Sequence, residues 1–360
     1  MLNLDTCGIE VSAKTLLVRL RRGDKVLPHR TFHNTPTGRR ELLRFLSGKR
    51  GVRICMEATG TYGLDLALEI SKVETFQLMV ANPKAIRNFA GALQTRSKTD
   101  LLDVVVIEEY VSRMPFKPWR PPAPAILHLR TLARRIQELG QQCVAEKNRL
   151  HAIRATTATP KIVLQDLLRS LKFLEKSRKN LQLAALKLIQ EDPLLSRQYQ
   201  LLLGVTGIAS LSAILILAEV APLSTELTAR QWVAFAGLDP KSHQSGSSID
   251  RKARLSKAGN PYLRRALYMP ALCAVFRDPA FRAFYKKLLG RDKRPLQAIS
   301  AAMRKLLHGI YGMFRNDQPF DTSRLFASCL PEPLTPGPHS LNAKEPQTSD
   351  GAIYCQFPLA

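Results

Sequence analysis

The sequence predicts a mixed α/β domain at the N-terminus and a mainly helical remainder. Two patterns carry this prediction. Short apolar and β-branched runs bounded by turn residues recur up to residue 81, whereas beyond residue 125 apolar residues recur at three- and four-residue steps. The first pattern is typical of strands and the second of amphipathic helices. At 360 residues the chain is long enough for two or three domains, each with its own core.

The first 118 residues alternate between predicted strands and helices. Three strands joined by short turns, followed by alternating helix and strand, form the element order of a ribonuclease-H-like domain. We therefore expect residues 1–118 to adopt that fold. The strands are predicted at 7–11, 15–20, 26–32, 52–57 and 76–81, and the helices at 38–46, 62–71, 84–92 and 97–113.

A proline-rich stretch and two long helices are predicted next, over residues 119–197. Five prolines between residues 115 and 124 favour a stiff, extended linker. The apolar spacing after it breaks near Pro160, which predicts two amphipathic helices joined by a turn, as in an antiparallel coiled-coil arm. Such a hairpin serves either as part of a bundle within one protomer or as a dimerisation arm, because alone it buries little area.

The remaining chain divides into a helical segment and a tail. Residues 198–322 are predicted to be mainly helical, with one Gly/Ser-rich loop. From residue 323 onward prolines are dense and the periodicity is lost. We therefore expect residues 323–360 to be disordered.

The charge of the chain points to a polyanionic partner. Lys+Arg number 54 against 29 Asp+Glu, a net charge of +25, and nucleic acid is the expected partner of such an excess. No apolar run is long enough to span a membrane, and the first residues lack the layout of a signal peptide. The six cysteines include no Cys-x-x-Cys pair, which argues against a zinc site or a disulfide framework and favours the cytoplasm.

Four acidic residues have the spacing of a metal site. Asp100 and Asp103 fall on one face of a predicted helix. Glu57 ends an apolar strand, at the edge where α/β proteins tend to bind ligands, and Glu10 lies within the first strand, where burial of an acid requires a partner. Together they offer ligands for one or two Mg²⁺ ions acting on a phosphodiester. Taken alone, the Asp100–Asp103 pair is better explained as a solvated acidic turn, and Glu57 also fits an isolated surface acid.

A second chemical centre is the basic, serine-bearing loop at residues 237–265. Ser245 precedes a glycine, and a serine hydroxyl becomes a nucleophile only beside a base, a metal or positive charge. The surrounding arginines suit a phosphate and the charge that develops on it. From the residues alone, a loop whose serines merely donate hydrogen bonds to phosphate is the favoured alternative. The basic residues expected to contact nucleic acid are Lys98, Arg251, Arg254, Lys257, Arg264 and Arg265.

A weaker motif precedes this loop. The segment 203–208 contains Gly204 and Gly207 just before a predicted helix. It is similar to half of a helix–hairpin–helix element, whose backbone N–H groups contact a phosphate. A plain turn has the same pattern.

Together these motifs resemble the one-hundred-and-ten family of bacterial insertion-sequence transposases, which are bridge-RNA-guided recombinases. The resemblance covers about residues 5–322, with the motifs in order. It implies an N-terminal RuvC-like domain with an Asp-Glu-Asp-Asp (DEDD) tetrad, a coiled-coil arm and a C-terminal transposase domain with a catalytic serine. The matching segments are residues 8–12, 55–60, 82–83, 98–103, 203–208, 235–240, 244–248, 256–267 and 303–307.

The resemblance also assigns roles to single residues. Glu57, Asp100 and Asp103 fall on the second to fourth tetrad positions, and Ser245 falls on the nucleophile. Glu10 stands where the family usually has Asp. Glu is one methylene longer, so either the Mg²⁺ is displaced or this copy is impaired. Asp5 is too distant to substitute, well over ten ångströms away at roughly 3.3 Å per strand residue.

The implied partners are donor and target DNA, a structured non-coding guide RNA and further copies of the chain. In such a homo-oligomer, from dimer to tetramer, the acidic centre of one protomer meets the serine of another. The guide RNA reads sequence by pairing with both DNAs. The expected location is the bacterial cytoplasm, at the nucleoid.

Three functional hypotheses follow. The leading one is a DNA recombinase that cuts and rejoins strands through a phosphoserine intermediate. The second is a metal-dependent, structure-specific nuclease of the RuvC type, in which water attacks and Ser245 grips phosphate. The third is a catalytically impaired relic, disabled at Glu10 and retained for binding RNA and DNA.

Overall fold

The structure is a computed structural model that describes residues 4–48, 50–58, 60–94, 99–245 and 249–326. For residues 242–245 and 249–253 it describes the backbone alone. The chain divides into two compact units, Met1–Leu127 and His128–Ala360.

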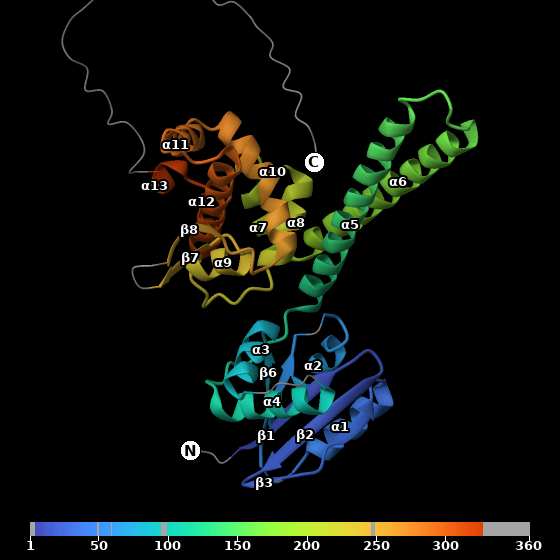
Figure 1. The fold of residues 1–360 in the computed structure, drawn as a ribbon, viewed down its shortest axis with the longest axis vertical. Coiled ribbons are helices and arrows are strands. Elements are labelled where there is room, and N and C mark those ends of the chain that lie inside the picture. The colour runs from blue at the N-terminus through green and yellow to red at the C-terminus, as the bar shows by residue number, and fades with distance from the viewer. Residues whose placement is uncertain (1–3, 49, 59, 95–98, 246–248, 327–360) are drawn as a thin grey trace, which may run out of the picture. The chain divides into compact units, whose positions relative to one another are not determined.

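The first unit is built on one mixed sheet with the strand order β3-β2-β1-β5-β6, and β4 also pairs with β2 (Figure 1). The strand β1 is antiparallel to β2 and parallel to β5, which is in turn parallel to β6. This arrangement confirms the predicted α/β class. The strands are β1 (Asp5–Val11), β2 (Thr15–Arg22), β3 (Lys25–Val26), β4 (Arg30–His33), β5 (Val52–Glu57) and β6 (Phe76–Ala81).

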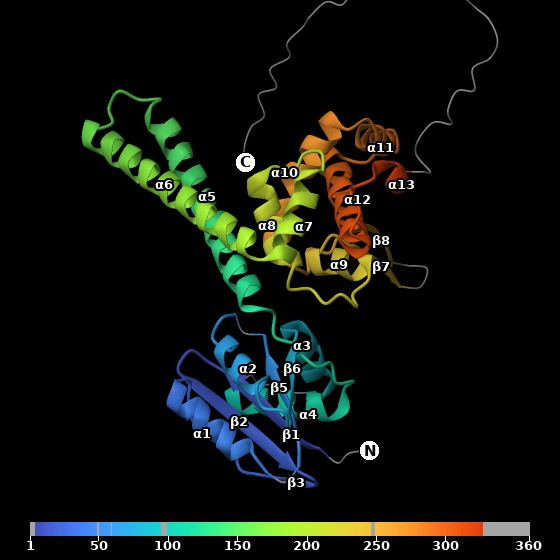
Figure 2. The same ribbon diagram turned by 180° about the vertical axis from the view of Figure 1, so that it is seen from behind.

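Helices cover both faces of this sheet (Figure 1; Figure 2). On one face, α1 (Pro36–Leu46) and α2 (Leu64–Ile70) bury their apolar residues against Ile9, Ile54 and their neighbours. On the other, α3 (Pro83–Ala92) and α4 (Asp100–Arg113) pack against Cys55 and Met79. Because side chains alternate along a strand, Glu10, next to Ile9, lies on the α3–α4 face.

The third predicted strand, residues 26–32, is interrupted. The structure has two short strands instead, β3 and β4, with Pro28 between them. Proline has no N–H to donate to a strand ladder, so pairing with β2 stops at Pro28 and resumes at Arg30. The preceding Leu27 still donates its N–H to the Leu20 carbonyl, at 2.9 Å.

The proline-rich stretch after α4 is tied to the first unit. Between α4 and α5 (Pro124–Ile153), the Trp119 N–H donates to the Leu78 carbonyl at 2.6 Å. The Trp119 side chain also packs on the sheet core, and the Phe116 ring lies under the Arg53 guanidinium, 5.1 Å away. This part of the linker is therefore held against β5 and β6.

The second unit contains the two long helices predicted on either side of Pro160. These are α5 and α6 (Lys161–Glu191), which lie side by side (Figure 1; Figure 2). An ion pair between Lys147 and Glu175, 2.8 Å apart, joins them across the hairpin. No helix in the described ranges has the length and apolar content needed to cross a membrane.

The rest of the second unit is a bundle of helices that carries one β-hairpin. The hairpin corrects our prediction, because the basic, serine-bearing segment is not simply a loop: residues 240–245 and 249–255 form two antiparallel strands. The elements are α7 (Pro193–Leu203), α8 (Ser210–Val220), α9 (Ala229–Ala236), β7 (Pro240–Ser245), β8 (Ile249–Leu255), α10 (Pro261–Arg277), α11 (Pro279–Leu289), α12 (Pro295–Asn316) and α13 (Thr322–Phe326).

The last of these helices corrects the predicted start of the disordered tail. We placed that start at residue 323, but residues 323–326 belong to α13. Phe326 is fully buried, with its ring centroid 4.9 Å from that of Phe281. An aromatic residue buried in this way anchors the segment to the bundle. The remainder of the predicted tail, residues 327–360, lies outside the described residues.

The helix α4 approaches the sheet very closely at Gly8 of β1. A Cβ atom at this position would lie 2.5 Å from the Glu108 nitrogen and 2.7 Å from the Val104 carbonyl oxygen. Both are backbone atoms of α4, which could not yield as a flexible side chain could. The helix therefore lies directly on the strand.

We expect Gly8→Ala to lower the free energy of unfolding by about 1–3 kcal/mol, because a methyl group would force α4 off the sheet. Gly91→Ala is the control, since a Cβ there meets no atom within 4 Å; in the helix α3 it should stabilise by about 0.5–1 kcal/mol. Urea denaturation followed by circular dichroism measures both. Equal changes in the free energy of unfolding for the two substitutions would show that α4 does not lie directly against Gly8.

Candidate active site

A buried carboxylate fixes α4 on the sheet. The Glu108 side chain has no solvent exposure. It accepts hydrogen bonds from Arg21 (2.7 and 2.9 Å), from the Thr6 hydroxyl (2.8 Å) and from the Ser112 hydroxyl (2.9 Å). The helix is thus tied to both β1 and β2 by charge-assisted bonds, which are the strong kind.

These bonds keep Glu108 ionised. Burial acts to raise the pKa of the carboxyl group, but the hydrogen bonds from Arg21, Thr6 and Ser112 outweigh it and hold the pKa below its usual value. Glu108 was not among the residues predicted from the sequence. The available signal was an acid directly after the apolar run 104–107, together with Arg19 and Arg21 on a neighbouring strand.

The way α4 crosses β1 determines where its first turn lies. Thr6 contacts Glu108, and two residues later Gly8 faces both Glu108 and Val104. The helix therefore runs opposite to β1, so Asp100, one turn before Val104, lies toward the Glu10 end of the strand.

A capping residue sets the start of α4. The Thr99 hydroxyl accepts a hydrogen bond from the Leu102 N–H at 3.2 Å. Helix geometry then begins at Asp100 and places Asp100 and Asp103 in the first turn. Asp100 is exposed and Asp103 half-buried. Carboxylates are favoured in this position because the N-terminal end of a helix carries partial positive charge.

The two glutamates lie side by side on neighbouring strands. The parallel register pairs Ile9 with Met56, and Glu10 and Glu57 are the residues that follow each. Both are half-buried and lie on the α4 face. On this face burial raises the pKa of the Cys55 thiol to about 12, with a further contribution from the Glu57 carboxylate.

The structure thus brings the four predicted acids to one edge of the sheet but does not form a closed cluster. Within the described part of the chain, no three His, Cys, Asp or Glu side chains are grouped closely enough to hold a metal ion. The donor set fits a hard divalent cation in its chemistry, since all four residues offer carboxylate oxygens. Side-by-side carboxylates repel, so a cation would supply the charge that draws them together.

Two other positions bear on this edge. Asp5 is buried, and its carboxylate accepts a hydrogen bond from the Gly23 N–H at 3.2 Å, at the opposite end of β1. It therefore cannot replace Glu10 as a ligand. Lys98, predicted to contact nucleic acid, lies outside the described residues.

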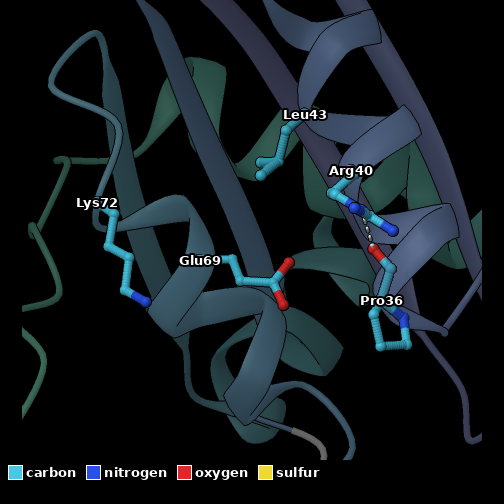
Figure 3. Close-up of a pocket in the computed structure, with 5 residues that line it drawn as sticks. All are labelled: Pro36, Arg40, Leu43, Glu69 and Lys72. Atoms are coloured by element: carbon cyan, nitrogen blue, oxygen red, sulfur yellow. Dashed lines mark hydrogen bonds between the residues drawn. The ribbon is translucent and has the colours of Figure 1, made fainter.

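A surface groove in this unit lies away from the acids. It opens between α1 and α2, has a volume of about 470 Å³ and is lined by Glu69, among others (Figure 3). The Glu69 carboxylate is ion-paired with Arg39 at 2.9 Å. Both helices cover the face of the sheet opposite to α4. The groove is therefore separate from the four acids.

Two glycines hold together the base of the serine-bearing hairpin. Gly237 ends α9 with φ of 65°, and a Cβ at Gly259 would lie 2.5 Å from the Gly237 nitrogen and 2.4 Å from the Phe235 carbonyl oxygen. Side chains larger than hydrogen do not fit there. In addition, the Ser256 hydroxyl donates to the Asp239 carboxylate at 2.5 Å.

The hairpin presents Ser245 at the end of β7. In the antiparallel register Ser245 pairs with Ile249, and Arg251 pairs with His243. The side chains of Ser245 and Arg251 are outside the described part. Arg254 and Lys257 have exposed side chains, as expected of residues that contact nucleic acid.

Arg264 and Arg265 are engaged within the protein. The Arg264 guanidinium donates to the Ala236 carbonyl at 2.8 Å, and burial, followed by the charge of Arg265, lowers its pKa. Arg265 donates to the Gln137 side chain at 3.4 Å. Arg264 therefore caps the end of α9, a structural contact that our sequence analysis did not anticipate.

The Gly204–Gly207 segment forms a turn that uses its own N–H groups. Those of Gly204, Val205 and Ile208 donate to carbonyls between residues 200 and 205. Gly207 has φ of 92°, and a Cβ there would lie 2.5 Å from the Pro270 carbonyl oxygen. These contacts favour the plain turn over the phosphate-binding alternative.

A second buried carboxylate joins three segments of this unit near the hairpin. It was not among the residues predicted from the sequence. Glu219 on α8 is 1% exposed and accepts two hydrogen bonds from Arg134 of α5, at 2.7 and 3.0 Å. It also accepts one at 2.6 Å from Asn260, which caps α10 directly after the hairpin. The arm helix, the core helix and the end of the hairpin segment are therefore joined at one point.

The chain matches known transposase families in both of its units. Residues 7–156 match a transposase family model of the IS110 DEDD type, and residues 178–286 match the model of the IS116/IS110/IS902 transposase family. The pilin gene-inverting proteins of Moraxella bovis and Moraxella lacunata are each 29% identical over 296 residues, covering 81% of this chain and 90% of theirs. The 43.6 kDa insertion element IS110 protein of Streptomyces coelicolor is 29% identical over 169 residues, covering 47% of this chain and 40% of its own.

We expect Glu108→Gln to lower the free energy of unfolding by about 3–5 kcal/mol at neutral pH, because it leaves Arg21 without its buried partner. The folded pKa of Glu108 is depressed, so its contribution is complete above the unfolded pKa of about 4.3 and is lost as the pH falls through the folded value. The difference in melting temperature between the wild type and the variant should therefore become smaller at acidic pH.

The matched control is Glu138→Gln, which removes an exposed ion pair with Arg135 and should cost at most about 1 kcal/mol. If the difference in melting temperature between the wild type and Glu108→Gln stays constant from neutral to acidic pH, Glu108 is not ionised in the folded protein.

Proposed function

Because the chain belongs to the IS116/IS110/IS902 family of transposases and is a DNA recombinase, we propose that it cuts and rejoins DNA through a phosphoserine intermediate formed at Ser245. The observation that carries this proposal is the division of the chemistry between the two matched regions. The four acids fall within residues 7–156, and Ser245 falls within residues 178–286. Each match therefore contains one of the two predicted centres.

The fold supports the finer parts of the proposal. In the first unit an antiparallel pair leads into parallel strands, with α4 crossing β1, which is consistent with a RuvC-like domain. In the second, α5 and α6 form the hairpin proposed as a coiled-coil arm. The net charge of +25 suits a protein that binds DNA and a structured guide RNA.

The carboxylates of Glu10, Glu57, Asp100 and Asp103 would hold the divalent metal, which we propose to be Mg²⁺ because all its ligands are oxygens. When bound, such an ion neutralises charge on the scissile phosphate and lowers the pKa of a coordinated hydroxyl. The protein contributes the placement: Glu10 and Glu57 from adjacent strands, and the aspartates from the first turn of α4.

In the proposed reaction the Ser245 hydroxyl oxygen attacks the phosphorus of one phosphodiester. The hydroxyl loses its proton to a basic group of the site, and a bond forms between the Ser245 oxygen and phosphorus. At the same time the bond from phosphorus to the leaving deoxyribose oxygen breaks, and that oxygen is protonated. After strands exchange, a deoxyribose hydroxyl attacks the phosphoserine and releases Ser245. The number of ester bonds is conserved, so rejoining needs no ATP.

Rejoining distinguishes this proposal from a nuclease that uses water. The Moraxella relatives are named for inverting a pilin gene, and an inversion requires that every cut end be joined again. We extend that behaviour to this chain, together with the guide RNA and the pairing of one protomer's acids with another protomer's serine. Such a protein would act at the bacterial nucleoid.

We expect Ser245→Ala to abolish the covalent protein–DNA adduct while leaving nucleic-acid binding near the wild-type level. The assay traps the adduct on a suicide DNA substrate, in the presence of Mg²⁺ and guide RNA, and detects it by denaturing electrophoresis. Ser248→Ala, a serine in the same segment, is the matched control and should retain the adduct. Cleavage by the wild type without any adduct would instead identify water as the nucleophile.

The same assay addresses the relic hypothesis through Glu10→Asp. Comparable adduct yields in the wild type and this variant would exclude an impaired site. Adduct that appears only with Asp at position 10 would show that the native chain is disabled there.

A further inference from the structure

A basic pocket lies in the second unit, at one end of the helical bundle. It has a volume of about 380 Å³ and opens between α11, α12 and α13. Its lining includes cations and apolar groups but no carboxylate. The lining residues are Phe284, Ala301, Arg304, Lys305, His308, Arg324 and Leu325.

Two of these cationic groups are already used by the fold. The Lys305 ammonium donates to the Leu325 carbonyl at 2.9 Å and lies 5.4 Å from the centre of the buried Phe326 ring. Arg324 is ion-paired with Asp321 at 3.1 Å. The Lys305 contacts fasten α13 to α12, whereas the Arg324–Asp321 pair is local to the start of α13.

Arg304 and His308, one turn apart on α12, have no such contacts. Both are half-buried. Across the described ranges of the chain, neither side chain has a hydrogen bond or an ion pair to another residue. The guanidinium nitrogens of Arg304 are not buried, so they can donate to an anion that enters the pocket.

The local electrostatics point the same way. Burial lowers the pKa of His308, and the charges of Arg304, Lys305 and Arg230 lower it further. Four basic groups therefore crowd one region in which the pocket lining supplies no opposite charge. Among the described residues, the carboxylate that an ion pair places beside this group is that of Asp321, which pairs with Arg324.

We propose that this pocket binds a backbone phosphate of a nucleic-acid strand. The planar Arg304 guanidinium can donate two parallel hydrogen bonds to phosphate oxygens, and the His308 ring can add a third. The inference rests on the proposed function, since it assumes that the chain handles nucleic acid. It adds a contact beyond the serine-bearing hairpin.

The pocket belongs to the same body as that hairpin. On α12, Tyr311 packs edge-to-face against Trp232 of α9, with ring centroids 5.3 Å apart. The helix α9 ends at Gly237, where the hairpin segment begins. A strand held at Arg304 is therefore fixed relative to the part of the protein that carries Ser245.

The test compares Arg304→Gln with wild-type protein in binding to two probes: a short DNA duplex of arbitrary sequence and a structured RNA stem-loop. We expect about tenfold weaker binding to one probe. The slope of log affinity against log salt concentration should also fall by about 1, because one phosphate contact is lost. The probe that shows both changes identifies the strand that occupies the pocket.

Arg291→Gln removes the same charge from an exposed position outside the pocket lining and should change neither quantity. Arg304→Lys keeps the charge and should restore the salt slope. Thermal melts of each variant monitor folding. Equal losses in Arg304→Gln and Arg291→Gln, or no loss with either probe, would overturn the proposal.

A second measurement follows His308 directly. Bound phosphate favours the protonated imidazole, so the pKa of His308, read by NMR, should rise when the binding probe is added. An unchanged His308 pKa at saturation would also overturn the proposal. None of these readouts uses the adduct assay, so failure here is distinguishable from failure of the Ser245 chemistry.

Discussion

The helix α4 lies against β1 backbone to backbone, and a carboxylate without access to water holds it there. Gly8 permits the approach and Glu108, bound to Arg21, Thr6 and Ser112, fixes it. Neither residue is a predicted metal ligand or the predicted nucleophile. Yet the position of the first turn of α4, and therefore of both aspartates, follows from them.

The sequence was informative wherever local pattern dictates structure. The strands 52–57 and 76–81 were predicted with their observed bounds, because each is an apolar run that ends at a clear boundary. Local pattern also predicts that Glu57 ends its strand and that Asp100 and Asp103 share one helical turn, but it does not place that turn beside the strands. What the pattern could not supply is long-range pairing, such as the bonds that join Glu108 to Arg21 across 87 residues.

The serine-bearing hairpin shows a second limit. Its strands are polar and basic and lack the alternation of apolar residues that marks a half-buried strand. What holds them is the packing of Gly237 against Gly259, a tertiary contact. The break at Pro28, by contrast, could have been predicted, because proline within a strand run is a local signal.

Buried acids have a common role in this strongly basic protein. Glu108 and Glu219 neutralise the arginines that join elements of each unit, whereas we propose that Arg304 and the exposed cations of the hairpin bind an external polyanion. We propose that basic charge in this protein is thus divided between holding the fold and binding phosphate.

The central claim is that Glu10, Glu57, Asp100 and Asp103 form one metal centre. Anomalous diffraction from crystals of the protein soaked in Mn²⁺ tests it most directly. We predict a manganese peak between these four side chains, within coordinating distance of at least three of them. A fully soaked crystal with no peak there would contradict the assignment of the metal centre.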